Sequence, residues 1–410
     1  MVSDTVLQVA QAQALISGML PRVQQQHRLS LHAALGRVLA EDIVSPIDVP
    51  PHDNAAMDGF ALRAAELRAD APTLLHVAGE GLAGQAFAGV VPPGACVRIT
   101  TGALMPPELD TVVPRELTTA DAEGRVRIQP GQLRCGDNRR RTGEDLARGQ
   151  VALAAGRLLR PADLGLLASL GQAEVPVWRR LRVAFFSTGD ELRSAGEPLG
   201  RGCIYDSNRY TVWGMLQRLG VEAHDLGIVR DDPAALRAAF DEASTRADAI
   251  VTSGGVSVGE ADHTKRVMAE LGDVLFWQIA MRPGRPLAVG RIGNAMLFGL
   301  PGNPVAVMVS FYAFVRDALL HMAGATPFTL PMLRARSTVP IRKRPGRTEY
   351  QRGIIERASD GEWQVTITGD QGSGILRSMS EANGMVVLPH DGGPVAAGEP
   401  VDVLPFDALV

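Results

Sequence analysis

Two polar loops in the middle of the chain carry residue types that could act on a phosphate group. The first, STGDEL at 187–192, follows the apolar run LRVAFFS and places Asp190 and Glu191 behind a glycine turn. Carboxylates at the carboxyl end of a strand can bind a metal ion or orient a water molecule. The alternative is that Asp190 only stabilises the next turn, because Asp and Gly are common turn residues.

The second loop is TSGGVSVGEADHTK at 252–265, which follows the apolar run ADAIV. Two successive glycines expose backbone N–H groups, and such groups can hold a phosphate without obstruction by side chains. Glu260, Asp262 and His263 follow directly, so anion-binding donors and metal-binding acceptors lie in one loop. For His263, the exposed surface of a helix is the more ordinary place.

Two proline-rich turns supply further groups. MRPGRP at 281–286 presents Arg282 and Arg285. Their guanidinium groups suit phosphate and other oxyanions and stay charged at any working pH, although a solvated basic turn is the alternative. GLPGNPV at 299–305 precedes an apolar run and has Asn303 in a possible N-cap position. By itself this motif indicates only a turn between a strand and a helix.

Acidic residues also cluster far upstream. DNAAMDGFALR at 53–63 contains Asp53 and Asp58, and RTGEDLARG at 141–149 contains an acidic pair that ends with Asp145. Each cluster alone is typical of a polar turn, and the second follows arginines whose charge it balances. Their significance depends on the other motifs.

The segment that must position the central loops runs from about 181 to 322. Apolar runs typical of strands alternate there with helical stretches such as SNRYTVWGMLQRLG; the runs are LRVAFFS, HDLGIV, ADAIV, DVLFWQIA and AMLFGL. This alternation predicts a parallel sheet with helices on both faces. Open sheets of this kind bind ligands beyond the carboxyl ends of their strands.

The flanking segments predict three further units. The amino terminus has helical periodicity through Val6, Val9 and Ala14 with Asp4 placed to cap, and LSLHAALGRVLAEDI predicts a second helix. Residues 73–130 are short apolar runs broken by Gly and Pro, as in a small β domain, and RPADLGLLASLGQ then predicts another helix. The carboxyl-terminal runs predict a small antiparallel β-barrel or sandwich.

Length and composition exclude several classes of protein. A chain of 410 residues predicts roughly two to four domains, and 46% apolar with 21% charged residues is typical of a folded protein. The net charge of -4 gives no global attraction to nucleic acid or an anionic membrane. Cys96, Cys135 and Cys203 predict neither a zinc site nor a disulfide framework. We see no charged leader and no run near the ~20 apolar residues that span a bilayer, so we expect a cytoplasmic protein.

Taken together and in order, the motifs resemble the molybdopterin molybdotransferase family, which includes the bacterial MoeA proteins and the E domain of gephyrin. The motifs that carry the resemblance are PPHDNAAMDGFALR, RITTGALMP, RTGEDLARG, TGDEL, TSGGVSVGEADHTK, MRPGRP, GLPGNPV and RTEYQRG. It extends from about residue 10 to the carboxyl terminus. It implies a homodimer of multidomain α/β and β subunits. The implied domains are an N-terminal helical domain at 1–46 and 143–177, an inserted β domain at 47–142, a doubly wound molybdopterin-binding α/β domain at 178–326, and a C-terminal β-barrel at 327–410.

The resemblance also implies an active cleft between subunits. In the family, this cleft lies between the α/β domain of one subunit and the N-terminal and inserted domains of the other. Asp58, Thr101 and Asp145 of this chain would therefore act across the dimer interface as catalytic residues.

The remaining implied residues lie in the α/β and barrel domains. Glu191 and Asp262 would bind Mg²⁺ or the pyrophosphate, supported by Asp231 or Asp232. Molybdate would wait beside Arg282, Arg285, Arg352 and Ser373. Substrate would contact a set of loop residues, namely Ser187, Thr188, Gly189, Asp190, Ser253, Gly254, Gly255, Ser257, Pro301 and Pro304.

The implied reaction is Mg²⁺-dependent hydrolysis of adenylylated molybdopterin, with release of AMP and entry of molybdate, the co-substrate, at the dithiolene sulfurs. The substrate brings its own sulfur ligands, so a Cys or His metal cluster is not expected. Bacterial members commonly have Lys where this chain has Arg282 and Arg285, which keeps the charge and changes its geometry.

The expected partners are the substrate, a second copy of the chain, the adenylyltransferase that makes the substrate, and the molybdoenzymes that accept the cofactor. One alternative is a paralogue on the same fold that handles tungstate. Another is a non-catalytic scaffold of the gephyrin type, which would imply an extra fused domain and a long linker.

Overall fold

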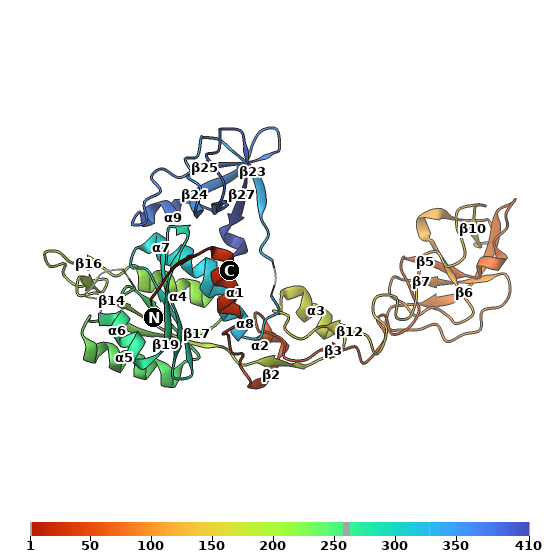
Figure 1. Cartoon of the computed structure of the whole chain (residues 1–410). Coiled ribbons are helices and arrows are strands. Elements are labelled where there is room, and N and C mark those ends of the chain that lie inside the picture. Colours follow the sequence, from red (N-terminus) through yellow and green to blue (C-terminus); the bar gives the residue numbers. More distant parts are fainter. Residues whose placement is uncertain (1, 257–262, 328, 410) are drawn as a thin grey trace.

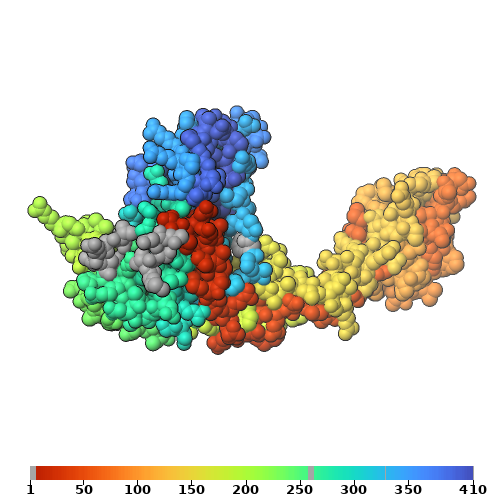
Figure 2. Space-filling model, in the orientation of Figure 1, coloured from red at the N-terminus to blue at the C-terminus, as the bar shows by residue number. Residues whose placement is uncertain are grey.

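The chain forms two bulky bodies joined by a narrow arm. The computed structural model describes residues 2–256, 263–327 and 329–409. Figure 1 shows an α/β domain with a small β domain above it, and the arm leading from them to a second β domain at the far end. The space-filling view shows the arm as the thinnest part of the molecule (Figure 2).

A seven-stranded sheet forms the centre of the α/β domain, in the order β1-β19-β21-β22-β18-β14-β17. Its strands are β1 (Val2–Leu7), β14 (Arg182–Thr188), β17 (Glu222–Val229), β18 (Ala249–Ser253), β19 (Gly272–Ile279), β21 (Pro286–Ile292) and β22 (Ala295–Leu300). The prediction of a parallel sheet is right for β17, β14, β18 and β22. It is wrong for β21, which is antiparallel to β22 and β19, because a two-residue turn at Gly293 joins β21 to β22 as a hairpin.

Helices cover both faces of this sheet, as predicted. Along β14, Val183 and Phe185 pack with α1, α4, α7 and α8, whereas Ala184 and Phe186 pack with α5 and α6 on the other face. The helices are α1 (Val9–Ser17), α4 (Asn208–Arg218), α5 (Pro233–Arg246), α6 (His263–Leu271), α7 (Pro304–Ser310) and α8 (Arg316–Met322), with the π-helical turn η3 (Phe311–Val315) between the last two. The fold is therefore doubly wound.

The continuous helical segment Pro304–Met322 is 19 residues long with a mean hydropathy of 1.4, which by length and composition alone would allow it to cross a membrane. Its length results from α7, η3 and α8 joining end to end. Since 78% of its most apolar window is buried inside the protein, it has the character of a core helix.

The start of the chain differs from the predicted helix. Residues Val2–Leu7 form β1, which pairs in parallel with β19, and α1 begins only at Val9 with Gln8 as its N-cap. Asp4 therefore lies in a strand, four residues before the N-cap of α1. The first element also belongs to the α/β sheet rather than to the N-terminal helical domain in which the sequence placed it.

The second predicted helix is also much shorter than expected. Within LSLHAALGRVLAEDI only α2 (Leu31–Ala34) is helical. Gly36 then takes a left-handed φ of +68°, and Val38 and Leu39 form bridges to other strands. Tertiary pairing overrides the helical periodicity here.

The arm is built from short strands that pair in twos. The pairs are β2 (Gln26–Ser30) with β13 (Glu174–Trp178), β3 (Ile43–Val44) with β12 (Val151–Leu153), and β4 (Asn54–Ala55) with β11 (Arg139–Arg140). Helices α2 and α3 (Pro161–Ser169) pack on the pairs nearest the α/β domain. Helix α3 begins at Pro161, and Gly171 follows its end with a φ of +73°, as the sequence predicted.

The far domain is the predicted inserted β domain. Its six-stranded sheet has the order β8-β5-β7-β6-β10-β9. The strands are β5 (Gly59–Leu62), β6 (Thr73–Gly81), β7 (Ala95–Ile99), β8 (Thr111–Pro114), β9 (Thr118–Ala120) and β10 (Val126–Ile128), with short helices η1 (Ala64–Glu66) and η2 (Arg115–Leu117).

The carboxyl-terminal domain is a five-stranded barrel, closed because β26 pairs with both β27 and β24. Its elements are β23 (Leu333–Ser337), β24 (Thr348–Arg357), β25 (Trp363–Ile367), α9 (Leu376–Glu381), β26 (Gly384–Leu388), β27 (Pro400–Pro405) and η4 (Phe406–Ala408). The predicted barrel is confirmed, but β23 and β25 run parallel. Strand β20 (Met281–Arg282) of the MRPGRP motif pairs with β24 and so ties the barrel to the α/β domain.

Candidate active site

A cavity of about 1390 Å³ lies where the parallel strands end. The loops after β14, β18 and β22 form one wall, and barrel residues 371–374 form another. The expected site residues that line it come from six separate segments of the chain: Thr188, Gly189, Glu191, Asp231, Ser253, Gly254, Gly255, Arg282, Arg285, Pro301, Pro304 and Ser373. The fold therefore brings most of the predicted α/β and barrel residues to one place.

Four expected residues do not line this cavity, or cannot be placed in it. Ser187 is 1% exposed, and its hydroxyl donates to Asp206 at 3.0 Å. The carboxylate of Asp190 accepts from the backbone N–H of Asp231 at 3.3 Å. Both side chains hold neighbouring loops and do not line the cavity. Ser257, like Asp262, lies outside the described residues.

Two glycine positions shape the floor of the cavity. Gly189 has a φ of +152°, and a Cβ there would lie 2.6 Å from Oε2 of Glu191. Gly254 has a φ of +94°, and a Cβ there would lie 2.6 Å from the carbonyl oxygen of Thr188. Only glycine fits such backbone and such contacts. The turn at Gly189 thus lets the Glu191 carboxylate fold over the end of β14.

The two candidate aspartates of VRDD have different roles. Asp232 is the N-cap of α5 and accepts from the backbone N–H groups of Ala234 and Ala235. Asp231 lines the cavity, and the hydroxyl of Thr264 donates to it at 3.4 Å. Of the two aspartates, Asp231 is therefore the one that faces the cavity.

The carboxylates of Glu191 and Asp231 fit a magnesium ion that a bound substrate would help to hold. Across the described part of the chain, no group of three or more His, Cys, Asp or Glu side chains is placed to hold a metal ion. Mg²⁺ commonly takes only one or two carboxylates and completes its shell with water and phosphate oxygens. The donor set suits that mode of binding.

Two residues that the sequence analysis did not select hold the cavity loops together. The Asn208 amide at the start of α4 donates to Ser253 Oγ at 2.8 Å and to the Gly302 carbonyl oxygen at 2.6 Å. Asp206 is 2% exposed and accepts from Ser187. The polar run DSN directly before this helix was the available signal. A short extension of the chain, with β15 (Leu192–Arg193) paired to β16 (Ile204–Tyr205), brings this run beside Glu191.

The barrel wall is fastened to the PGNP turn. Ser373 Oγ accepts from the Asn303 amide at 3.0 Å, and the Ser373 carbonyl accepts from the Val305 N–H at 3.0 Å. Asn303 does occupy the N-cap position of α7, but its side chain makes no capping hydrogen bond. The bond to Ser373 explains this, and it links two motifs that are about 70 residues apart.

Arg352 does not line the main cavity, although the sequence placed it beside the oxyanion. It is completely buried and lies against a neighbouring cavity of about 610 Å³. Its guanidinium donates to Ser378 Oγ and to the carbonyl oxygens of Asp370, Gln371 and Gly372. Burial lowers the pKa of Arg352 to about 10, which leaves it charged at neutral pH. Arg352 therefore supports the loop that carries Ser373.

Replacing Arg352 by Met should lower the free energy of unfolding of the barrel domain by about 2–4 kcal/mol, because buried carbonyl groups lose their donors. Urea titration followed by the fluorescence of Trp363, which lies on β25, would measure the loss. Arg336→Met is the matched control, since Arg336 is exposed on strand β23 of the same barrel. Equal, small effects of both substitutions would contradict a supporting role for Arg352.

Asp58 and Thr101 form a pair in the inserted domain, whose strands β5 and β7 lie at the end of the molecule far from the α/β domain (Figure 1). Asp58 precedes β5 and Thr101 follows β7, and these strands pair in antiparallel fashion. The Asp58 carboxylate accepts from the Thr101 N–H and hydroxyl, each at 2.7 Å. The bond from the Thr101 N–H lowers the pKa of Asp58, so it stays ionised at neutral pH. Within one chain, neither residue reaches the cavity.

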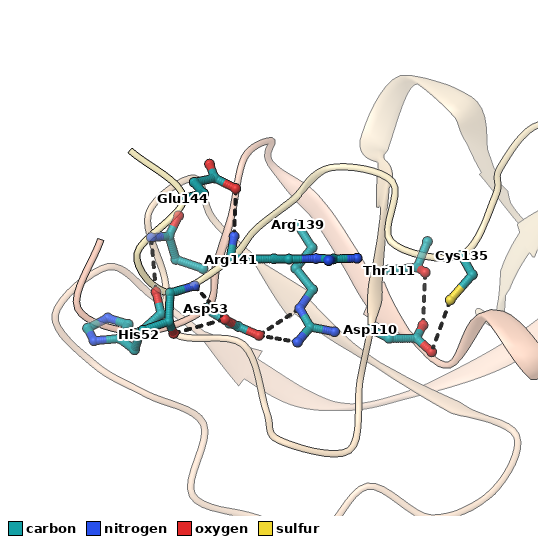
Figure 3. Close-up of polar contacts among 10 residues, drawn as sticks. His52, Asp53, Asp110, Thr111, Cys135, Arg139, Arg141 and Glu144 are labelled. Atoms are coloured by element: carbon teal, nitrogen blue, oxygen red, sulfur yellow. Dashed lines mark hydrogen bonds and ion pairs between the residues drawn. The ribbon is translucent and has the colours of Figure 1, made fainter. Parts of the chain in front are cut away.

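A second cluster joins the two strands that lead to the inserted domain. The Asp53 carboxylate accepts from the Thr142 N–H at 2.7 Å, from the Thr142 hydroxyl at 3.0 Å and from the Arg139 guanidinium. Figure 3 shows Asp53 facing Arg139 across the arm. The Thr142 N–H is the main reason that the pKa of Asp53 is lowered. The cluster holds the motif DNAAMDGFALR, which contains Asp58, against the motif RTGEDLARG, which contains Asp145. Asp145 is exposed and does not line the cavity.

These features define a class of protein. A doubly wound α/β domain holds a large cavity at its strand ends, a barrel domain closes it, and glycine turns, carboxylates and arginines line it. Such a site suits an anionic ligand larger than a free phosphate.

Comparisons with known proteins identify the family. The chain matches the MoeA N-terminal region (domain I and II) over residues 7–171, a probable molybdopterin binding domain over 184–321, and the MoeA C-terminal region (domain IV) over 334–406. It is 42% identical over 410 residues to a molybdopterin molybdenumtransferase of Haemophilus influenzae, covering 99% of this chain and 100% of that protein. The chain belongs to the MoeA family.

Other relatives agree with this assignment. A Mycobacterium tuberculosis protein named molybdopterin molybdenumtransferase 2 is 37% identical over 382 residues, which cover 91% of this chain and 93% of that one. The crystal structure of a molybdopterin biosynthesis moeA protein from Pyrococcus horikoshii superposes with a TM-score of 0.84 at 28% identity, over 98% of this chain and all of that one. The predicted family and fold class are confirmed.

Proposed function

We propose that this chain is a molybdopterin molybdenumtransferase that hydrolyses adenylylated molybdopterin, releases AMP and lets the dithiol sulfurs of molybdopterin bind the molybdenum of molybdate, with one oxo group leaving as water with the two thiol protons. The observation that carries the proposal is that one cavity unites two carboxylates, Glu191 and Asp231, with the guanidinium groups of Arg282 and Arg285. The named relatives support the substrate's identity.

Each wall of the cavity has a part in the proposed reaction. The glycine turn at 254–255 offers backbone N–H groups to a phosphate. Glu191 would orient the attacking water and, with Asp231, would hold Mg²⁺ beside the phosphoanhydride. Mg²⁺, when bound, would neutralise phosphate oxygens. Hydrolysis breaks the bond between the two phosphates, and the departure of AMP leaves space for an oxyanion beside the arginines.

The proposed active site is shared between two copies of the chain. Asp58, Thr101 and Asp145 lie too far along the arm to reach the cavity of their own subunit, yet Asp58 and Thr101 form an ionised, exposed pair. A twofold dimer would bring this pair to the partner's cavity. Unpaired Cys96, Cys135 and Cys203 are consistent with a cytoplasmic location. The adenylyltransferase that makes the substrate and the molybdoenzymes that accept the cofactor would be its partners there.

Ser373→Trp should separate the two half-reactions. The indole would occupy the barrel side of the cavity, where the oxyanion is proposed to wait, and leave Glu191 and Asp231 unchanged. We expect AMP release to stay within about twofold of the unmodified protein, while formation of active cofactor, measured by reconstitution of an apo-molybdoenzyme, falls by at least about a hundredfold.

Ser380→Trp provides the control, because Ser380 is exposed on α9 and does not line the cavity. It should leave both activities unchanged. Equal loss of AMP release and cofactor formation in Ser373→Trp would contradict separate places for the phosphoanhydride and the oxyanion. Repeating the assay with tungstate in place of molybdate tests the alternative metal.

A further inference from the structure

A third arginine reaches the cavity from the barrel domain. Arg347 lines the same space as Arg282 and Arg285. Among the residues described, the guanidinium groups of these three arginines form no hydrogen bond or ion pair. An unpaired guanidinium group that faces a ligand cavity is suited to bind an anion.

The pairing of β20 with β24 fixes Arg347 close to the other two arginines. Met281 pairs with Thr348, and the Thr348 N–H donates to the Ala280 carbonyl at 2.8 Å. Arg347 directly precedes this pair, and Arg282 directly follows Met281. The barrel arginine and the MRPGRP turn are therefore parts of one connected structure.

A buried lysine holds the turn that carries Arg347. Lys343 is only 4% exposed, and its Nζ donates to the carbonyl oxygens of Arg347 at 2.7 Å and Arg344 at 3.0 Å. It also lies 3.3 Å from the Gly392 carbonyl oxygen. No carboxylate forms an ion pair with it in the described part of the chain. Burying an ammonium group is unfavourable unless carbonyl groups solvate it, and these carbonyls belong to the turn that ends at Arg347.

We propose that Arg347 is a third oxyanion-binding residue of this cavity and that Lys343 is its positioning residue. The proposal extends the proposed function and rests on it for the identity of the anion. Arg347 would bind a tetrahedral oxyanion group, either free molybdate or a phosphate of the nucleotide substrate. Lys343 acts through the backbone, by fixing the turn at 344–347.

The test measures anion binding directly, so it does not require turnover. Isothermal titration of the full-length protein with molybdate, and separately with pyrophosphate, compares unmodified protein with Arg347→Gln. Loss of one charged donor should weaken binding by about tenfold. If Arg347→Gln weakens the binding of molybdate alone, Arg347 binds the metal oxyanion. If it weakens the binding of pyrophosphate alone, Arg347 binds a phosphate of the substrate. Either result supports the proposal. Arg344→Gln, in the same turn but outside the cavity lining, should change neither.

Lys343→Met tests the positioning role, and Lys343→Arg tests rescue by a conserved charge. We expect Lys343→Met to weaken binding of the same anion that Arg347→Gln affects, by about threefold to tenfold. The double variant should bind this anion no more weakly than Arg347→Gln alone. A lower midpoint of thermal unfolding with unchanged anion affinity would show that Lys343 is only structural. Unchanged binding of both anions by Arg347→Gln, with normal binding by the unmodified protein, would overturn the inference but not the proposed function. Absence of binding by the unmodified protein would contradict both.

Discussion

Replacing Glu191 by Gln is expected to abolish AMP release, with a fall of at least about a hundredfold. Gln keeps the size of the side chain but removes the negative charge, which lies beside Gly189 just after the end of β14. The neutral amide would no longer orient the attacking water, and the electrostatic balance at the phosphoanhydride would be lost. AMP formed from adenylylated molybdopterin, quantified by chromatography, is the measurement.

Glu197→Gln is the matched control for this substitution. Glu197 lies on the same extension of the chain, where it accepts from the Ser194 N–H, and it does not line the cavity. The control should retain full activity. Substantial AMP release by Glu191→Gln would mean that the reacting phosphates bind elsewhere.

Mixing two inactive variants should restore activity if the site is shared between subunits. Asp58→Asn damages the contribution of the inserted domain, and Glu191→Gln damages the cavity. Random exchange of subunits from equal amounts gives half heterodimers, and each heterodimer has one site free of both changes. We therefore expect about one quarter of the activity of the unmodified dimer.

A second mixture discriminates between a shared site and general stabilisation by a partner. Glu191→Gln mixed with Asp231→Asn leaves every heterodimer with a lesion in both cavities, since both residues line the same cavity of one chain. That mixture should show no recovery. Equal recovery in the two mixtures, or none in the first, would contradict an active site formed across a dimer.

The sequence was most informative where polar residues follow apolar strands. Four cavity residues lie at or just after the ends of the parallel strands β14, β18 and β22, namely Thr188, Glu191, Ser253 and Pro301. The carboxyl ends of parallel strands meet at one edge of the sheet, so the topology alone brings these residues together. Contacts that depend on tertiary approach were not predictable. Arg347 lies in a barrel loop, and only its position beside β20 shows that it reaches the α/β cavity.

The same limit explains the errors in the fold. Helical periodicity from Leu31 onward was real but local, and Gly36 ended the helix where the chain turns to pair with other strands. Strand β1 was missed because a strand at the edge of a sheet needs only a few residues and a partner distant in sequence. The burial of Arg352 was likewise not predictable, because residue type and motif do not reveal burial.

The most direct test of the account is to incubate the purified protein with adenylylated molybdopterin, Mg²⁺ and molybdate, and to measure both AMP release and transfer of active cofactor to an apo-molybdoenzyme. We predict that both products depend on the protein, that omission of Mg²⁺ removes AMP release, and that omission of molybdate removes active cofactor. AMP release that proceeds equally without the protein would contradict the proposed function.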